Sequence, residues 1–373
     1  MPGVPSRPPT SRSNRLTDRA GMIPPGKTIG IVGGGQLGRM LSIAAANLGY
    51  RSAIYAPEPS GPAADVSARW VQGAYDDLDA LRAFGASVDI ITYEFENIPV
   101  GPLEALRVPL APHPRALATA QDRATEKAFI QAIGGRPAPW ALVSSRDDLD
   151  AALELTGAPA ILKTRRLGYD GKGQARLKTA ADADEAWASI GWQPAVLEGF
   201  IDFSREFSLL VVRGADGTIA SWDPVLNVHE DGILALSTVP AELAPATVEA
   251  ARALAEKIVT ELDYVGVLAI EFFETPAGPV FNEMAPRVHN SGHWTIEGAV
   301  TSQFENHVRA ICGLPLGSTA RAANRVEMRN LIGEQAGDWD LILSDPAAHL
   351  HLYGKGQARP GRKMGHVTKL FFD

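Results

Sequence analysis

Two glutamates, Glu271 and Glu283, have the side chains and the spacing to hold a metal ion together. They stand twelve positions apart in residues 265–287, where two apolar runs flank a turn that carries Pro276 and Gly278. This pattern predicts a β-hairpin. The fold-back of its two strands would bring both carboxylates to one spot.

The hairpin permits two interpretations. Carboxylates inside apolar strands are costly to bury unless they are paired or bind a metal. Because Mg²⁺ is commonly held by one or two carboxylates together with substrate phosphates, the pair is a candidate metal and nucleotide site. The alternative is that one or both glutamates point to solvent from the polar face of a half-buried strand. The hairpin alone does not decide between them.

A glycine-rich segment, TRRLGYDGKGQ, is the densest motif in the chain and follows an apolar strand predicted to end at Lys163. Gly168, Gly171 and Gly173 lie within six positions and are flanked by basic residues. This composition suits a flexible loop that closes over a polyphosphate. It is not a Walker A sequence, because no Lys-Ser/Thr pair follows the glycines. A plain hairpin tip is the alternative.

A second glycine motif, Gly33, Gly35 and Gly38, follows a short apolar strand and opens an amphipathic helix. Its G-x-G-x-x-G spacing suits an anion at a helix N-terminus. A dinucleotide also needs an acidic residue at the end of the next strand, but Glu58 comes only after Pro57. The motif therefore permits three interpretations. The loop could bind the dinucleotide of an NAD-dependent dehydrogenase, it could bind a phosphate of a smaller ligand, or its glycines could serve only tight packing.

Further polar side chains follow predicted strands. Glu94 and Glu96 come after an apolar strand at residues 88–93, where ligands bind in open α/β sheets, although both could simply be solvated. The loop after the hairpin, APRVHNSGHWT, is dense in polar residues, which favours a site over a core. A late basic patch, RPGRKMGH, is either a solvated turn or a binder of a substrate phosphate.

The elements that must position these residues alternate between strands and helices up to about residue 110, which predicts a small doubly wound domain. We predict helices over residues 116–133, 146–156 and 245–261, the first with Arg123 and Lys127 on one face. Three short strand-like pieces end the chain.

Composition excludes several classes of protein. The formal net charge of −8 argues against non-specific binding to nucleic acid or to an anionic membrane. No apolar run approaches the length that spans a bilayer. The single cysteine, Cys312, excludes an internal disulfide and fits a reducing cytoplasm. Residues 1–26 lack a secretory apolar core, and we expect a disordered leader or an upstream start with Met22 as the working one.

Taken together, the motifs resemble the ATP-grasp superfamily and, within it, the N5-carboxyaminoimidazole ribonucleotide synthetases. The resemblance is carried in order by GGGQLGRM, YEFENIP, GYDGKGQ, NVHEDGIL, NEMAPRVHNSGHWTIEGA and RPGRKMGH. It implies an α/β and α+β fold with a Rossmann-like pre-ATP-grasp domain, a two-lobed ATP-grasp domain and a small β-rich C-terminal domain. The predicted ranges are residues 27–115, 116–312 with a mobile lid lobe at about 137–200, and 313–373.

The resemblance also implies roles for individual residues. Glu271 and Glu283 look like the Mg²⁺ ligands, and Arg287, His289, Lys355 and Lys172 look like the catalytic residues. The implied ATP contacts are Arg123, Lys163, Gly168, Tyr169, Asp170, Gly171, Lys172, Gly173, Gln174, Glu198, Gly199, Phe200, Ile201, Glu206, His229, Asn282 and Glu283. The implied substrate contacts are Gln36, Leu37, Glu94, Tyr169, Asp170, Arg287, His289, Asn290, Lys355, Arg362 and Lys363.

The chemistry that the resemblance implies is the ATP-dependent carboxylation of 5-aminoimidazole ribonucleotide by bicarbonate, in purine biosynthesis. The implied partners are these small molecules, with ATP and Mg²⁺ as cofactors and a second copy of the chain as a homodimer. Such chemistry asks the protein mainly for charge neutralisation, positioning and a lid that excludes water. Another ATP-grasp ligase is the nearest alternative, and a nucleotide-binding regulator without activity is a further one.

Overall fold

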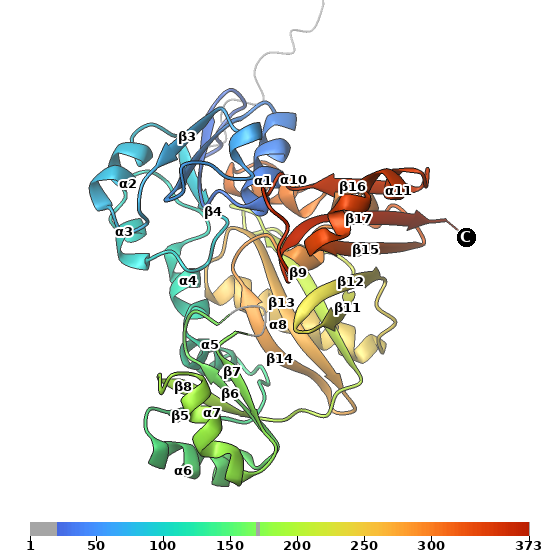
Figure 1. Ribbon diagram of the computed structural model, residues 1–373. Helices are drawn as coiled ribbons and strands as arrows, with labels where there is room; N and C mark the ends of the chain where they lie inside the picture. Colours follow the sequence, from blue (N-terminus) through green and yellow to red (C-terminus); the bar gives the residue numbers. More distant parts are fainter. Residues whose placement is uncertain (1–20, 169–171, 373) are drawn as a thin grey trace, which may run out of the picture.

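The computed structural model describes residues 21–168 and 172–372, which form three β-sheets with helices packed around them (Figure 1). The chain starts in a parallel α/β domain, passes through a small antiparallel lobe and then builds a large antiparallel sheet. The predicted fold class is confirmed. No helix within these two ranges has both the length and the apolarity needed to cross a membrane.

The N-terminal domain is a four-stranded parallel sheet with the hydrogen-bonded order β3-β2-β1-β4. Strands β1 and β4 end side by side, with Val32 paired to Tyr93, so the segments that follow them start at the same edge of the sheet. The elements are β1 Thr28–Val32, α1 Gln36–Asn47, β2 Arg51–Ala56, a 3₁₀ turn Ala64–Val66, β3 Arg69–Gln72, α2 Leu78–Gly85, β4 Ile90–Tyr93 and α3 Val100–Glu104.

Residues 21–26 pack against the body of the protein, so a disordered leader does not extend to residue 26. The Ile23 N–H donates to the Cys312 carbonyl at 3.0 Å, and the Tyr50 hydroxyl donates to the Ile23 carbonyl at 2.6 Å. Residues 1–20 lie outside the described residues, and the start at Met22 stays a prediction.

The single helix predicted for residues 116–133 is wrong, because the chain forms two helices there, α4 Pro114–Ala120 and α5 Arg123–Ala132. Asp122 lies between them, and its side chain accepts a hydrogen bond from the Ala124 N–H at 3.0 Å. An aspartate at this N-cap position satisfies backbone donors that would otherwise be unpaired. The cap therefore favours a new helix start over a continuous helix.

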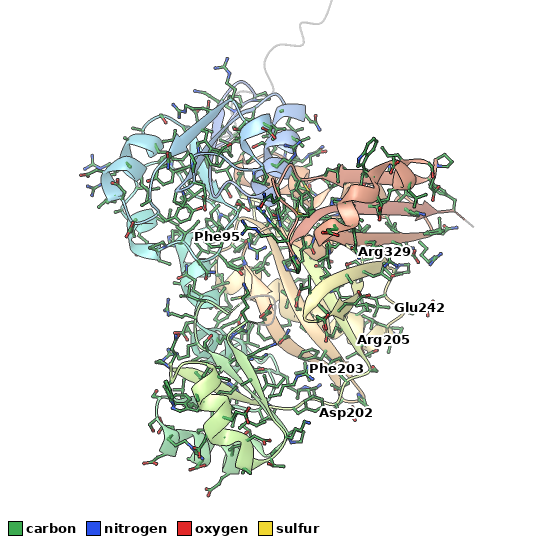
Figure 2. All side chains as sticks on the ribbon, in the orientation of Figure 1. Phe95, Asp202, Phe203, Arg205, Glu242 and Arg329 are labelled. Carbon is green, nitrogen blue, oxygen red and sulfur yellow. The ribbon has the colours of Figure 1, made fainter. Side chains whose placement is uncertain are left out.

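The lobe that the resemblance implies to be a lid, called the lid lobe below, is a four-stranded antiparallel sheet, β5-β8-β6-β7, with its own small core under two helices. Its elements are β5 Trp140–Val143, α6 Arg146–Thr156, β6 Ala160–Thr164, β7 Gln174–Leu177, a 3₁₀ turn Ala180–Asp182, α7 Ala183–Ser189 and β8 Ala195–Gly199. Helix α6 has the predicted bounds. Figure 2 shows Asp202 and Phe203 where the chain leaves this lobe for the large sheet.

The large sheet has nine antiparallel strands in the order β14-β13-β9-β11-β12-β15-β17-β16, with β10 paired to β9. The three C-terminal strands therefore extend the sheet of the preceding domain. The elements are β9 Arg205–Arg213, β10 Ile219–Ser221, β11 Val225–Glu230, β12 Ile233–Val239, α8 Pro245–Glu261, β13 Gly266–Thr275, β14 Gly278–Ala285, a 3₁₀ turn Asn290–Gly292, α9 Thr295–Gly298, α10 Gln303–Ile311, β15 Arg325–Ile332, a 3₁₀ turn Gly333–Asp338, α11 Trp339–Leu343, β16 Ala348–Leu352 and β17 Lys363–Phe371.

Strand β9 is buried on both faces, which explains its almost continuous apolar sequence. Leu209 and Val211 pack with α8 on one face, whereas Leu210 and Val212 join the core that holds α10 and α1 on the other. Each fully buried aliphatic side chain contributes about 1.5–3 kcal/mol. The large sheet is therefore packed on both faces at β9.

His307 joins the N-terminal domain to the large sheet. Its Nδ1 accepts a hydrogen bond from the Val267 N–H at 3.1 Å, and its Nε2 lies 2.8 Å from the Thr92 hydroxyl of β4. Burial lowers the pKa of this imidazole to about 3. The ring is therefore neutral in the folded protein at any pH near neutrality.

We predict that His307 makes the protein sensitive to acid. The folded-state pKa lies below the unfolded value of about 6.5, so the unfolded state binds more protons between pH 6.5 and 3, and stability falls as pH falls through that window. His307→Asn should reduce the pH dependence of the unfolding free energy there by about 1.4 kcal/mol per pH unit. Urea unfolding at several pH values measures it. If the unfolding free energy of His307→Asn depends on pH as steeply as that of the wild type, His307 is not the group responsible.

Candidate active site

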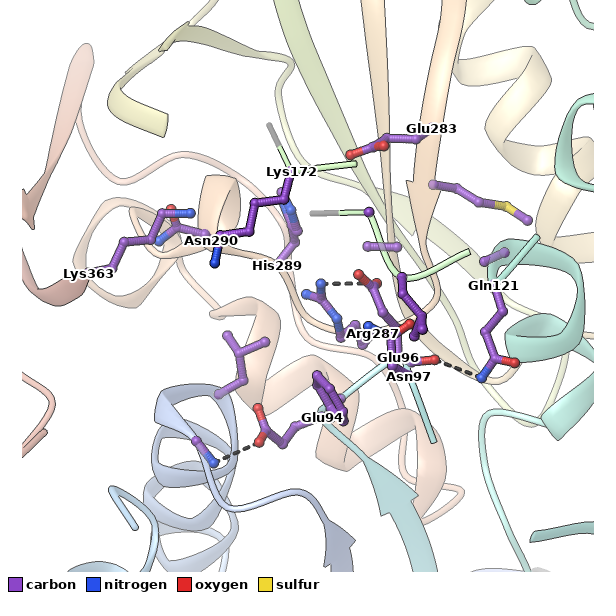
Figure 3. A pocket seen from close by; sticks show the side chains of 18 of the residues that line it. Glu94, Glu96, Asn97, Gln121, Lys172, Glu283, Arg287, His289, Asn290 and Lys363 are labelled. Atoms are coloured by element: carbon purple, nitrogen blue, oxygen red, sulfur yellow. Dashed lines mark hydrogen bonds and ion pairs between the residues drawn. The ribbon is translucent and has the colours of Figure 1, made fainter. Parts of the chain in front are cut away.

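A cavity of about 800 Å³ lies where the N-terminal domain, the lid lobe and the large sheet meet. Figure 3 shows side chains of these parts pointing into it. The cavity brings together fourteen of the predicted site residues: Gln36, Leu37, Glu94, Arg123, Gly168, Lys172, Glu271, Glu283, Arg287, His289, Asn290, Lys355, Arg362 and Lys363.

The predicted hairpin is confirmed, and its two glutamates lie directly opposite each other in the β13–β14 register. Burial and the nearby charge of Glu283 raise the pKa of Glu271 to about 7. Burial also opposes ionisation of Glu283, but the charges of Arg123 and Lys163 keep its pKa below the usual value. The Arg123 guanidinium donates to Glu283 at 3.0 Å. The pKa values of the two paired carboxyl groups are therefore shifted in opposite directions.

The loop after β14 is fixed by side-chain contacts to its backbone. Gln303 accepts a hydrogen bond from the His289 N–H at 2.9 Å and donates to the His289 carbonyl at 2.6 Å. The amides of Asn290 and Asn330 exchange two hydrogen bonds of 2.9 and 2.7 Å. Burial, and then the charge of Arg287, hold the pKa of His289 well below its usual value, so a neutral imidazole faces Glu271 at 3.8 Å.

The G-x-G-x-x-G loop holds a carboxylate of the protein itself. Glu94 Oε1 accepts a hydrogen bond from the Gly35 N–H at 2.7 Å, at the N-terminus of α1. A Cβ on Gly33 would lie 2.7 Å from the same oxygen, so the close approach requires glycine. Glu94 thus lies where the pyrophosphate of a dinucleotide would bind. The loop gives no support to an NAD-dependent dehydrogenase.

Two lysines enclose the buried carboxylate of Glu198. Lys127 Nζ lies 3.0 Å from one oxygen and Lys163 Nζ lies 2.9 Å from the other. Burial would raise the pKa of Glu198, but the two ammonium groups lower it to about 2. The cluster has one more positive charge than negative, and it links α5 to the lid lobe. A net positive charge at this place suits a phosphate group.

Asp122 forms a second link between α5 and the lid lobe. The guanidinium of Arg165 donates to both of its oxygens, at 3.1 and 2.8 Å, and Arg166 Nε lies 3.3 Å from it. Both arginines belong to the glycine-rich segment and line the cavity just before Gly168. Asp122 was not among the predicted site residues, and the two arginines were noted only as basic residues that flank the glycines. An aspartate ahead of a helix-forming run was the available signal.

Glu126 is another cavity residue that the sequence analysis missed. Its carboxylate accepts a hydrogen bond from the Met284 N–H at 2.8 Å, next to Glu283. Burial raises its pKa to about 8, and the charge of Lys127 opposes the rise. The side chain therefore fixes the backbone of β14 without adding a full negative charge to the site at neutral pH.

The remaining predicted residues lie outside the wall of the cavity or outside the described residues. Glu206 and His229 form an ion pair of 2.7 Å on neighbouring strands of the large sheet. Lys163 of β6 lies opposite Gln174 of β7 in the strand register of the lid lobe. The others outside the wall are Gly173, Glu198, Gly199, Phe200, Ile201 and Asn282. Tyr169, Asp170 and Gly171 lie outside the described residues.

The C-terminal cations come from the turn between β16 and β17. Lys355 Nζ donates to the Lys363 carbonyl at 2.7 Å and lies 5.4 Å above the ring of Tyr353. Arg362 donates to the Gln357 carbonyl at 3.1 Å. These contacts hold the cationic side chains at the edge of the cavity next to the N-terminal domain.

Three family models match consecutive parts of the chain. They describe a ribonucleotide synthetase pre-ATP-grasp domain over residues 26–121, an ATP-grasp domain over 128–304 and a phosphoribosylaminoimidazole carboxylase C-terminal domain over 327–371. The N5-carboxyaminoimidazole ribonucleotide synthase of Brucella melitensis is 52% identical over 93% of this chain and 97% of its own. The chain belongs to the N5-carboxyaminoimidazole ribonucleotide synthase family.

Solved structures agree with this family. The N5-carboxyaminoimidazole ribonucleotide synthetase of Thermus thermophilus is 48% identical, with a TM-score of 0.86 over 92% of this chain and 93% of its own. The enzyme of Aspergillus clavatus in complex with ADP and 5-aminoimidazole ribonucleotide is 33% identical, with a TM-score of 0.86 over the same shares. The resemblance read from the motifs is confirmed. As a synthase of this family the chain is an ATP-dependent ligase.

The lysine and glutamate cluster leads to a prediction about stability. Lys127→Met leaves a neutral pair of Lys163 and Glu198, so we expect it to lower the free energy of unfolding by less than about 2 kcal/mol. Glu198→Gln leaves two buried ammonium groups and should lower it by about 3–5 kcal/mol. Chemical unfolding without nucleotide measures both. Lys27→Met, which breaks an exposed ion pair with Asp89, is the control with little effect. If both variants lower the free energy of unfolding equally, the cluster does not carry the extra positive charge that we assign to it.

Proposed function

We propose that this chain carboxylates the exocyclic amine of 5-aminoimidazole ribonucleotide with bicarbonate and ATP, giving N5-carboxyaminoimidazole ribonucleotide, ADP and phosphate. One observation carries the proposal: a single cavity joins the carboxylate pair of β13 and β14, the cations after β14 and the ligand-binding edge of the N-terminal domain. The reaction needs a nucleotide, an anion and an acceptor side by side, and these three groups of residues lie around one space.

The proposed reaction has two stages. An oxygen of bicarbonate attacks the γ-phosphorus of ATP, ADP leaves, and carboxyphosphate forms. Its carbon–oxygen bond to the phosphate then breaks to give CO₂ and phosphate, and the amine of the ribonucleotide forms a bond to CO₂ and loses a proton. Phosphoryl transfer of this kind depends on positioning and charge neutralisation more than on covalent help from the protein. The cations of the cavity supply that neutralisation.

The residues around the cavity fit Mg²⁺. Within the described ranges no group of three or more His, Cys, Asp or Glu side chains is arranged to hold a metal. Two opposed carboxylates are nevertheless the donor set that Mg²⁺ uses when phosphates and water complete its shell. Glu271 and Glu283 would hold the ion, which when bound offsets the charge of the phosphates. Arg123 already contacts one oxygen of Glu283.

We assign the other residues from the family resemblance and, for those that line the cavity, also from their place around it. Lys163, Arg123 and the glycine-rich loop would hold the phosphates of ATP, and Glu198 to Ile201 would face its adenosine. Arg287 and the neutral His289 would hold the carboxylating anion. Gln36, Leu37 and Glu94 on one side and Lys355, Arg362 and Lys363 on the other would hold the ribonucleotide. In this scheme Lys172 approaches the acceptor from the lid lobe.

Glu283→Gln tests the metal assignment. An amide is a poorer ligand for Mg²⁺ than a carboxylate, so we expect turnover to fall by at least about 100-fold, the size of effect seen when one transition-state contact is removed. Phosphate release and carboxylated product are measured together with ATP, bicarbonate and ribonucleotide. Glu256→Gln, an exposed position on α8, is the control. Near-normal turnover of Glu283→Gln would show that the assignment is wrong.

The same assay separates the alternatives. A regulator without activity would bind ATP and release no phosphate with bicarbonate and ribonucleotide. Another ATP-grasp ligase would release phosphate only with a different acceptor.

Since this family acts on small metabolites, we also place the protein in the cytoplasm.

The homodimer implied by the family resemblance is also part of the proposal. We expect light scattering at micromolar concentration to give about twice the chain mass of 39.7 kDa. A mass that stays at one chain over the concentration range would contradict it.

A further inference from the structure

Glu96 occupies a place in the cavity that the proposed binding roles do not explain. Its Oε2 lies 3.0 Å from Arg287 Nη2, and Figure 3 shows this contact among the side chains that line the cavity. Glu96 follows β4 of the N-terminal domain, whereas Arg287 follows β14 of the large sheet. The ion pair therefore bridges two domains at the arginine assigned to the carboxylating anion.

Both partners are fixed by further contacts. Arg287 Nη1 donates to the Val288 carbonyl at 3.0 Å, so each terminal nitrogen of the guanidinium has an anchor. These contacts use two of its five N–H groups, which leaves others for an incoming anion. The Gln121 side chain donates to the backbone carbonyls of Glu96, at 2.8 Å, and Ile98, at 2.6 Å. Gln121 thus anchors the backbone of the loop that carries Glu96.

A direct role in ligand binding does not suit Glu96. A carboxylate repels bicarbonate and phosphates, which are the anions that the cavity has to hold. Stability does not explain the pair either, because the Glu96 side chain is 31% exposed and ion pairs open to water contribute little. What the contact does achieve is to fix the plane and direction of the Arg287 guanidinium, which matters because an arginine binds oxyanions through a planar fork.

We propose that Glu96 is a positioning residue that orients Arg287 and thereby couples ATP cleavage to carboxylation of the acceptor. The inference rests on the proposed function. Arg287 stands four residues after Glu283 on one side and contacts the segment of Glu94 and Glu96 on the other. It thus lies between the site of phosphate cleavage and the site of the acceptor. A short-lived carboxyl group has to remain between these two sites until the amine captures it.

Loss of the ion pair should therefore affect coupling more than ATP cleavage. In Glu96→Gln the amide oxygen is a weaker acceptor than the carboxylate, so the guanidinium is held mainly by the Val288 carbonyl and can turn away from the anion. In the proposed scheme His289 still contacts the bicarbonate, and cleavage of the γ-phosphate depends mainly on the hairpin carboxylates and the phosphate-binding cations, so it should continue. More of the carboxyl group would then be lost to water as bicarbonate, and phosphate would appear without product.

The test measures phosphate and carboxylated ribonucleotide in the same reaction. In the wild type we expect the ratio of phosphate to product to be close to one. In Glu96→Gln we expect the ratio to rise by about tenfold, the order of effect of one lost charged hydrogen bond. Bicarbonate-dependent phosphate release should stay within about threefold of wild type, since the metal-binding carboxylates are untouched. The ratio does not depend on how much of the protein is folded.

Two further variants sharpen the comparison. Gln121→Leu removes both hydrogen bonds to the Glu96 loop without changing a charge, and we expect it to raise the ratio in the same direction. Glu305→Gln is the matched control, because Glu305 pairs with Arg309 at 2.9 Å on α10 and is also 31% exposed. It should keep the wild-type ratio.

A ratio near one in Glu96→Gln, with product formed at any rate, would overturn the inference. A lower KM for bicarbonate with intact coupling would also overturn it, because Glu96 would then only compete with the anion. If the wild type itself forms no carboxylated ribonucleotide, the proposed function fails. If the wild type and Glu96→Gln both form product with a ratio close to one, only the inference about Glu96 fails.

Discussion

The site depends on the register of one pair of strands, β13 and β14. Leu268, Ile270 and Phe272 of β13 pack in the core under α8, and side chains alternate between faces, so Glu271 must point to the opposite face with Val267 and Ala269. A shift of one residue would turn Glu271 into the core. Burial of apolar side chains on one face therefore places the carboxylates on the other. The packing of the core thus fixes the place of the carboxylates in the cavity.

Around this pair, three cations that we assign to the phosphates or to the carboxylating anion are each matched by a carboxylate of the protein. Arg123 contacts Glu283, Lys163 contacts Glu198 and Arg287 contacts Glu96. Pairing lets cations be kept close together without the full cost of their mutual repulsion. It also holds their side chains in place before a ligand arrives, so less conformational entropy is lost on binding. An arriving nucleotide or anion then adds to, or takes over from, contacts that are already oriented.

The sequence predicted the parts of this arrangement that arise from local patterns. Apolar alternation and turn residues gave the hairpin and helix α6, and the order of motifs gave the family. Contacts between distant residues left no local pattern: Lys127 and Glu198 are far apart in the chain, and so are Arg123 and Glu283. Glu94 was placed correctly at a strand end, yet its position in the glycine loop depends on how the end of β4 lies against α1. The break between α4 and α5 was missed because the N-cap signal of Asp122 was read as part of one apolar pattern.

The sharing of one sheet by two domains has a mechanical consequence. The turn with Lys355, Arg362 and Lys363 leads into β17, which is joined through β15, β12, β11 and β9 to β13 and its carboxylate. Cations assigned to the acceptor and carboxylates assigned to the metal thus belong to one hydrogen-bonded body. The lid lobe is a separate sheet, tied to that body by the stacking of Phe203 on Phe273 and by the links from Asp122 and Lys127 on the α5 side. A movement of the lid lobe, which we propose would bring the glycine-rich loop over ATP, would therefore leave the distance between the C-terminal cations and the hairpin carboxylates unchanged, because both groups belong to the large sheet.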